Sequence, residues 1–189
     1  MVRRIVGPAL AAVTLVLAVA APAGARTEQS ARPAGPTVAA RPANAMRSLE
    51  NQMLAKLNRV RAQHGLAPLR FSRKLAAAAT QHSREMAQVG YFSHNSADGT
   101  AFWRRIEGFY TSQGYHSWSV GENLLWSSPD VDAAGAVKMW MASPEHRENL
   151  LNRDWREIGL AAVHSDSAPG TYHGLGVTIV TADFGARAK

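Results

Sequence analysis

Cysteine is absent from all 189 residues of this chain. Its absence excludes disulfides, thiol nucleophiles and thiolate metal sites, so stability must come from packing and chemistry from His, carboxylate or hydroxyl groups. Three local signatures are also absent: the H-E-x-x-H helix of zinc proteases, the G-x-S-x-G turn of serine hydrolases and a glycine loop for phosphate. No internal repeat is visible. Local motifs alone therefore indicate no specific activity.

The net charge of +7 is not concentrated on one surface that would suit nucleic acid. Arg3 and Arg4 lie in the leader described below, and residues 26–45 contribute two more charges, which leaves +3 for residues 46–189. Basic and aromatic residues do not alternate as they do in single-strand binders. We therefore expect no nucleic-acid binding, and we expect the basic segment 26–45 to contact an anionic cell envelope.

The first 25 residues have the order of a secretory signal peptide: two arginines, an apolar run, and Ala23-Gly24-Ala25. The alternative is an uncleaved membrane anchor, because Ile5 to Ala23 approaches the length that spans a bilayer. No Cys follows the apolar run, which excludes a bacterial lipoprotein anchor. The leader predicts a protein that is secreted, extracellular or in the cell envelope.

Residues 26–45 are rich in Ala, Pro, Gly, Thr and Arg and almost free of large apolar side chains. Such a segment cannot bury enough surface to offset its ordering entropy, so it is predicted to be a flexible linker. Residues 46–187 are then one domain, long enough for a real hydrophobic core.

Apolar periodicity within that domain predicts an α+β fold. Helical spacing covers 46–63, 72–89, 101–108 and 131–142, with Asp130 as the expected cap of the last helix. Ser143 and Pro144 end that helix and start another. Extended segments are expected at 66–71, 156–164 and 171–185, and residues 115–126 are expected to form an extended segment or a loop.

Two polar residues lie in apolar surroundings. His82 falls on the apolar stripe of the helix at 72–89, where a hydrogen-bonded core histidine is a better interpretation than a ligand. Glu122 is flanked by Val120, Leu124 and Trp126. Burying an unpaired carboxylate is costly, so Glu122 either points to solvent or has a partner such as a histidine.

The order of several motifs resembles the CAP superfamily of cysteine-rich secretory, antigen 5 and pathogenesis-related-1 proteins, in its bacterial branch without disulfides. The resemblance covers nearly all of residues 46–187. It rests on N-x-x-R at 58–61, GYFSH at 90–94, GEN at 121–123, W-x-x-S-P-E-H-R at 140–147 and EIGL at 157–160.

The resemblance implies a three-layer α-β-α sandwich with a central antiparallel sheet, and a cleft in which two His and two Glu meet. By position these are His94, Glu122 and His146, while Ser143 occupies the usual place of the second Glu. Glu145 is a substitute for that Glu or only a helix-start residue, because neighbours on a helix point about 100° apart.

The resemblance further implies that His94 and His146 bind a divalent metal, commonly zinc, and two imidazoles alone would hold it weakly. No organic cofactor is expected, and the protein is expected to be a monomer. The main hypothesis is a binding module for an extracellular lipid, glycan or peptide. The alternative is an envelope hydrolase acting on peptidoglycan or peptide bonds, with Glu122 as a catalytic acid or base. A third interpretation is that these residues only tie loops to the sheet.

Overall fold

The computed structural model describes residues 43–189. The predicted signal peptide and most of the predicted linker lie outside these residues. The first helix begins at Ala43, three residues before the predicted start of the domain. The elements follow in this order: α1 (Ala43–Gln63), β1 (Arg70–Phe71), α2 (Arg73–Val89), α3 (Phe102–Phe109), β2 (Ser117–Ser127), α4 (Ala133–Ala142), α5 (Pro144–Leu150), β3 (Glu157–Ser165), the 3-10 helix η1 (Gly170–Tyr172) and β4 (Val177–Ala188).

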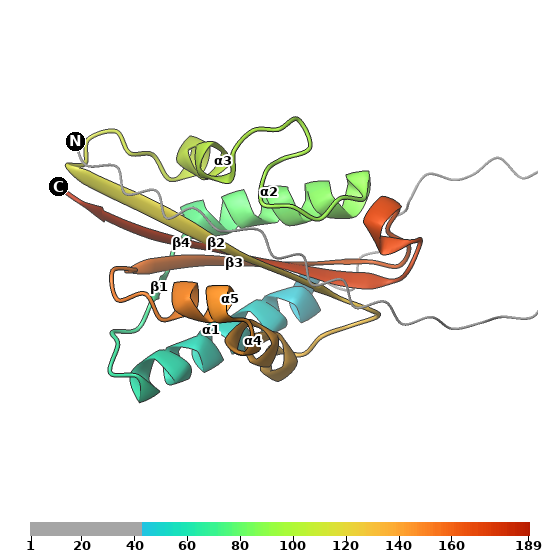
Figure 1. Cartoon of the computed structure of the whole chain (residues 1–189), viewed down its shortest axis with the longest axis horizontal. Helices are drawn as coiled ribbons and strands as arrows, with labels where there is room; N and C mark the ends of the chain where they lie inside the picture. Colours follow the sequence, from blue (N-terminus) through green and yellow to red (C-terminus); the bar gives the residue numbers. More distant parts are fainter. Residues whose placement is uncertain (1–42) are drawn as a thin grey trace, which may run out of the picture.

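The fold is the predicted α-β-α sandwich (Figure 1): α2 and α3 cover one face of the sheet, and α1, α4 and α5 cover the other. The sheet has the order β1-β3-β4-β2, so β2 is an edge strand. The three long strands are antiparallel, and the short β1 pairs with β3 in the parallel sense. Layers on both faces explain why residues 177–185 of β4 are all buried and do not alternate in polarity.

Each face of the sheet has its own packed cluster. The face toward α1 and α4 is filled by a large cluster that includes Met53, Leu57, Trp140 and Phe184. The opposite face holds two smaller clusters, one around Met86 and Tyr172 under the end of α2, and one that lies under α3. The division into two faces places α2 and α3 on the same side of the sheet as the polar residues described below.

Local chemistry sets most of the element boundaries. Gly65 and Gly90 have φ values of 67° and 87°, as expected for glycines that end helices in the left-handed region. The prediction that Asp130 caps α4 was wrong. Asp132 is the cap, and its Oδ1 accepts a 2.6 Å hydrogen bond from the Gly135 N–H. The last predicted strand also begins later than expected, at Val177, because 170–172 form η1.

Candidate functional site

The edge strand β2 brings the sequence-predicted residues together. Glu122 lies in β2 on the face covered by α2 and α3, and His94 belongs to the loop between those helices. His146 comes from α5 in the other layer. The Asn123 Nδ2 donates to the His146 carbonyl at 3.0 Å, so α5 is fastened directly to β2. We call His94, Glu122 and His146 the His/Glu site.

Two asparagines explain how α5 reaches the edge of the sheet. The Nδ2 of Asn149 donates to the Glu122 carbonyl at 3.1 Å and to the Asn123 Oδ1 at 2.9 Å. The Trp155 indole N–H in turn donates to the Asn149 Oδ1 at 3.0 Å. An edge strand leaves backbone groups unpaired, and here a helix side chain satisfies one of them. These bonds give a structural reason for Asn123 in the GEN motif and for Asn149, which follows the SPEHR motif in α5.

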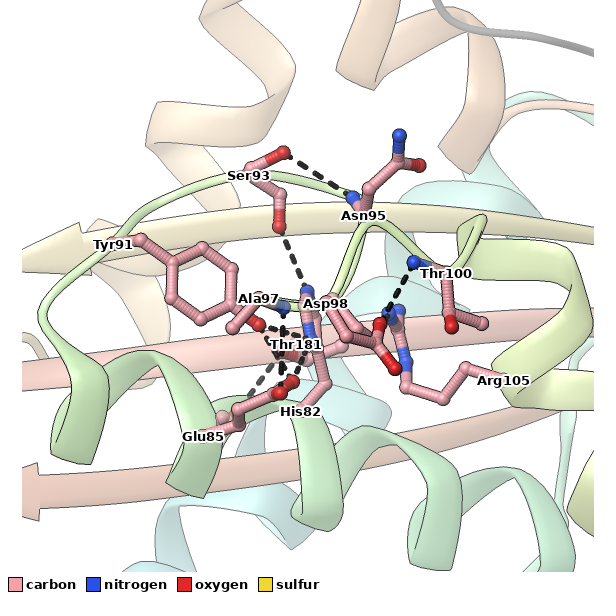
Figure 2. Close-up of polar contacts among 12 residues, drawn as sticks. His82, Glu85, Tyr91, Ser93, Asn95, Ala97, Asp98, Thr100, Arg105 and Thr181 are labelled. Atoms are coloured by element: carbon pink, nitrogen blue, oxygen red, sulfur yellow. Dashed lines mark hydrogen bonds and ion pairs between the residues drawn. The ribbon is translucent and has the colours of Figure 1, made fainter.

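The loop that carries His94 is anchored by α2 (Figure 2). The Nε2 of His82 bonds the Ser93 carbonyl at 2.8 Å, and His82 is fully buried. Glu85 accepts from the Tyr91 hydroxyl at 2.6 Å and from the Ala97 N–H at 3.3 Å. His82 is therefore the hydrogen-bonded core histidine that the sequence predicted. Its role is to hold the residue next to His94.

Glu122 is the centre of the His/Glu site. Its Oε1 lies 2.7 Å from the His94 Nδ1, and its Oε2 accepts from the Arg105 guanidinium. The Glu122 side chain is only 1% exposed, whereas that of His94 is 26% exposed. Because an ionised carboxylate only accepts hydrogen bonds, it fixes the proton on the His94 Nδ1 and leaves the Nε2 lone pair available.

Arg105 was not among the predicted site residues, although it holds the site together. It lies in α3 and is 6% exposed. Its Nη1 donates to the His94 carbonyl at 3.0 Å and to the Ser96 Oγ at 3.3 Å, while Nη2 pairs with Glu122. A single guanidinium thus joins the loop, the helix and the edge strand. One feature of the sequence could have identified Arg105: it is a basic residue on the apolar stripe of a short helix.

Asp183 of β4 is a second carboxyl group that sequence reasoning missed. It pairs directly with Glu122 across β2 and β4, and it is fully buried. Neither of its oxygens has a hydrogen-bond partner of good geometry among residues 43–189. Burial and the neighbouring Glu122 raise the pKa of Asp183 well above its usual range. Asp183 is thus a second carboxyl group next to Glu122, buried beneath the site, and only the strand register reveals it.

The other carboxyl and imidazole pKa values reflect the same burial. Desolvation raises the pKa of Glu122, whereas the Arg105 guanidinium opposes this shift and favours the carboxylate. Desolvation lowers the pKa of His94, and Arg105 lowers it further. Desolvation also lowers the pKa of His146, with His94 as the second cause. Both imidazoles are therefore neutral at pH 7, the form that can donate a lone pair.

Ser143 and Glu145 take different positions relative to the site. Ser143 joins α4 to α5 through backbone bonds, and its side chain makes no capping bond. Glu145 is exposed in the first turn of α5, but its charge raises the pKa of both His94 and His146. Glu145 thus influences the site electrostatically, whereas no contact links Ser143 to it among the described residues.

A resident zinc ion does not fit the donors present. Within residues 43–189 no group of three or more His, Cys, Asp or Glu side chains could hold a metal. Zinc sites in proteins use three or four protein ligands. One oxygen of Glu122 is already bonded to His94 and the other to Arg105, so His94 and His146 remain as two donors without a third.

The chain matches the family profile described as CAP, the cysteine-rich secretory protein family, over residues 54–184. This chain belongs to the CAP family. It is 35% identical over 112 residues to the uncharacterized membrane protein YlbC of Bacillus subtilis, covering 59% of this chain and 30% of YlbC. It is 30% identical over 118 residues to the uncharacterized protein YkwD of the same organism, covering 62% of this chain and 44% of YkwD.

Solved structures agree with this assignment. An extracellular protein with an SCP domain from Bacillus anthracis superposes with a TM-score of 0.58 at 26% identity, over 76% of this chain and 41% of that protein. An outer surface protein of Borrelia burgdorferi superposes with a TM-score of 0.57 at 20% identity, over 72% of this CAP chain and 91% of that protein, and shows the fold alone. The bacterial relatives and the absence of cysteine agree with the predicted branch. The chain spans less than half the length of YlbC, YkwD and the Bacillus anthracis protein.

Proposed function

We propose that this CAP-domain protein is a secreted binding module whose His/Glu site takes an extracellular ligand of the lipid, glycan or peptide class. The observation that supports the proposal most directly is that the Glu122 side chain is buried and fully hydrogen-bonded. Both of its oxygens are engaged and its side chain is buried, so it orients His94 and is not itself presented to a substrate. The group left for a ligand is the His94 Nε2, and His146 is near enough for His94 to lower its pKa.

The location outside the cell is part of this proposal. The leader sequence supports it, and so does the Bacillus anthracis protein, which is described as extracellular. YlbC is described as a membrane protein. No helix between Ala43 and Lys189 is long and apolar enough to cross a bilayer. The basic residues of 26–45 would then contact the anionic envelope.

A divalent metal would have two imidazoles as protein ligands, so we expect weak binding that strengthens when a ligand adds its own donor atoms. Calorimetric titration of the purified protein with zinc tests this. We expect one weak site that is lost in His94→Ala and in His146→Ala. The matched control is His116→Ala, because His116 is exposed and has no side-chain bond among the described residues. Zinc binding that persists in both site variants would exclude metal binding at this site.

A second candidate function is hydrolysis in the envelope, and the 2.7 Å contact between His94 and Glu122 favours it. A carboxylate that fixes the tautomer of an imidazole is the arrangement of a general base. In this hydrolytic function His94 removes a proton from water, and Glu122 orients the His94 imidazole. His146 would polarise the substrate. The test is incubation with purified cell wall, followed by mass spectrometry of released fragments. Equal release by wild type, His94→Ala and Glu122→Gln would exclude catalysis at the site.

A further inference from the structure

The outer face of α3 carries a shallow, open hollow that the His/Glu site does not use. The hollow has a volume of about 410 Å³ and is lined by Trp103, Arg104, Glu107 and Gly108. The inner face of the same helix buries Phe102, Arg105 and Ile106. At about 100° per residue, Trp103 and Glu107 point about 160° away from Arg105, and Arg104 points about 100° away. The hollow and the His/Glu site therefore lie on different faces of one helix.

Trp103 supplies the hollow with a fixed aromatic surface and a free donor. Its ring is partly buried and packs against the cluster beneath α3. The indole N–H groups of Trp118, Trp140 and Trp155 all donate to protein oxygens. In residues 43–189 no such acceptor faces the indole N–H of Trp103 or that of Trp126, whose ring instead packs edge-on against Tyr172. A tryptophan in this setting is anchored on its apolar side and can donate a hydrogen bond outward.

Opposite charges lie near this ring. The Arg104 guanidinium lies over the Trp103 ring, 5.0 Å from its centroid, and has no carboxylate partner within the described part of the chain. Glu107 uses one oxygen to accept from the Ser112 hydroxyl at 2.5 Å, and its second oxygen is unbonded there. An anionic ligand would be repelled by Glu107 and a cationic ligand by Arg104. The pair is suited to a neutral ligand that both donates and accepts hydrogen bonds.

Gly108 has no structural reason to be glycine. Within residues 43–189 a Cβ at this position would meet no atom within 4 Å, and the φ of Gly108 is not in the left-handed region. Glycine inside a helix costs roughly 0.5–1 kcal/mol relative to alanine. Neither packing nor backbone geometry therefore accounts for it. A ligand that occupies the hollow and needs the space next to Trp103 would account for it.

We propose that Trp103, Arg104, Glu107 and Gly108 form a binding subsite for a neutral pyranose ring of a glycan. The pyranose takes the place of the Arg104 guanidinium over the Trp103 ring, so that its apolar C–H face packs on the indole. Its hydroxyl groups accept from the indole N–H and from the displaced Arg104 and donate to Glu107. This chemistry uses every group that lines the hollow. The subsite stands independently of the ligand and metal proposed for the His/Glu site.

The test follows the indole N–H signals of the whole protein by ¹H–¹⁵N NMR during titration with two neutral tetrasaccharides, cellotetraose and chitotetraose. Trp103→Phe assigns the signal of Trp103. We expect that signal to shift saturably with at least one sugar, while the signals of Trp140 and Trp155 stay in place. Comparison of the two sugars shows whether an acetamido group contributes. No shift with either sugar would overturn the proposal.

Gly108→Leu is the discriminating variant, because it fills the hollow without removing any contact. We expect it to weaken sugar binding at least tenfold while the other indole signals and the zinc titration stay unchanged. Met139→Ala, at an exposed apolar position on α4, is the matched control and should bind sugar as wild type does. Sugar binding that survives Gly108→Leu would place the sugar elsewhere and overturn the subsite. Failure of the zinc titration alone would count only against the His/Glu site.

Discussion

Glu122 and Asp183 are directly opposite each other on the neighbouring strands β2 and β4, and both are buried. Arg105 is the only guanidinium that contacts this pair among the described residues. Two ionised carboxylates beside one buried cation would leave an uncompensated negative charge, which is costly. The raised pKa of Asp183 resolves this, because a neutral Asp183 beside an ionised Glu122 leaves one anion to face one cation. The two acids therefore have different roles.

This difference predicts opposite results for two isosteric substitutions. Asp183→Asn replaces a neutral acid with a neutral amide and should change the free energy of unfolding by less than about 1 kcal/mol. Glu122→Gln removes the charge that faces Arg105 and should cost on the order of 3–5 kcal/mol, as when one partner of a buried ion pair is lost. Urea unfolding at pH 7 measures both changes. A larger loss for Asp183→Asn than for Glu122→Gln would contradict the assignment.

His82 predicts how stability depends on pH. Burial lowers the pKa of His82 in the folded protein to about 3, from 6.5 when exposed. Between these values the unfolded chain binds a proton that the folded protein does not, so His82 makes stability fall as pH falls from 6.5 toward 3. The slope from this one group reaches at most roughly 1.4 kcal/mol per pH unit.

His82→Gln isolates this contribution, because an amide N–H can still donate to the Ser93 carbonyl. Unfolding free energies of wild type and variant, measured from pH 7 to pH 4, should give a wild-type curve that falls more steeply with acid. Equal dependence of the unfolding free energy on pH in wild type and variant would show that His82 is not a neutral core group in the folded protein.

The sequence predicted the fold well because its local signals agreed with the tertiary structure. Glycine caps, apolar stripes and the Ser143-Pro144 break specify boundaries through backbone chemistry, and these are local properties. The error at Asp130 has a local cause as well: two aspartates lie two residues apart, and either could cap α4. The cap is Asp132, whose carboxylate reaches the Gly135 N–H.

The site was only partly predictable, for a physical reason. His94, Glu122 and His146 were identified through a family resemblance, and the contact between His94 and Glu122 agrees with it. Arg105 and Asp183 depend on strand register and on which face of α3 is buried. Spacing along the chain does not specify these properties. Asp183 in particular lies in a strand buried on both faces, where alternation of polar and apolar residues gives no signal.

Close packing between β2 and α5 explains why residue 121 of the GEN motif is glycine. The effect of an added methyl group at Gly121 can be compared with its effect at Gly108. A Cβ at Gly121 would lie 2.7 Å from the Trp155 ring and 2.8 Å from the Asn149 Oδ1, so β2 and α5 could not approach as they do. Gly121→Ala should cost roughly 1–3 kcal/mol through this overlap. The same substitution at Gly108, where no atom is near, should stabilise by about 0.5–1 kcal/mol. Thermal unfolding of the two variants checks the prediction, and equal shifts in Tm would contradict it.

The buried side chain of Arg61 links α1 to α5, the helix that carries His146. Its buried guanidinium donates to the carbonyls of Ala67, Leu150 and Asn152, and so fastens the end of α1 to the end of α5. Lysine keeps the charge but cannot reach three carbonyls with a planar fork. Arg61→Lys should therefore cost on the order of 3 kcal/mol in the free energy of unfolding, since hydrogen bonds of charged groups are lost.

The same substitution should also affect the site, because α5 carries His146. If His146 helps to bind zinc, Arg61→Lys should weaken zinc binding at a temperature where the variant is still folded. Arg59→Lys is the matched control, since Arg59 lies on the exposed side of α1 and should change neither stability nor zinc binding. Unchanged unfolding of Arg61→Lys would contradict the structural role of Arg61. Lower stability with unchanged zinc binding would show that the position of His146 depends on the asparagine bonds to β2 alone.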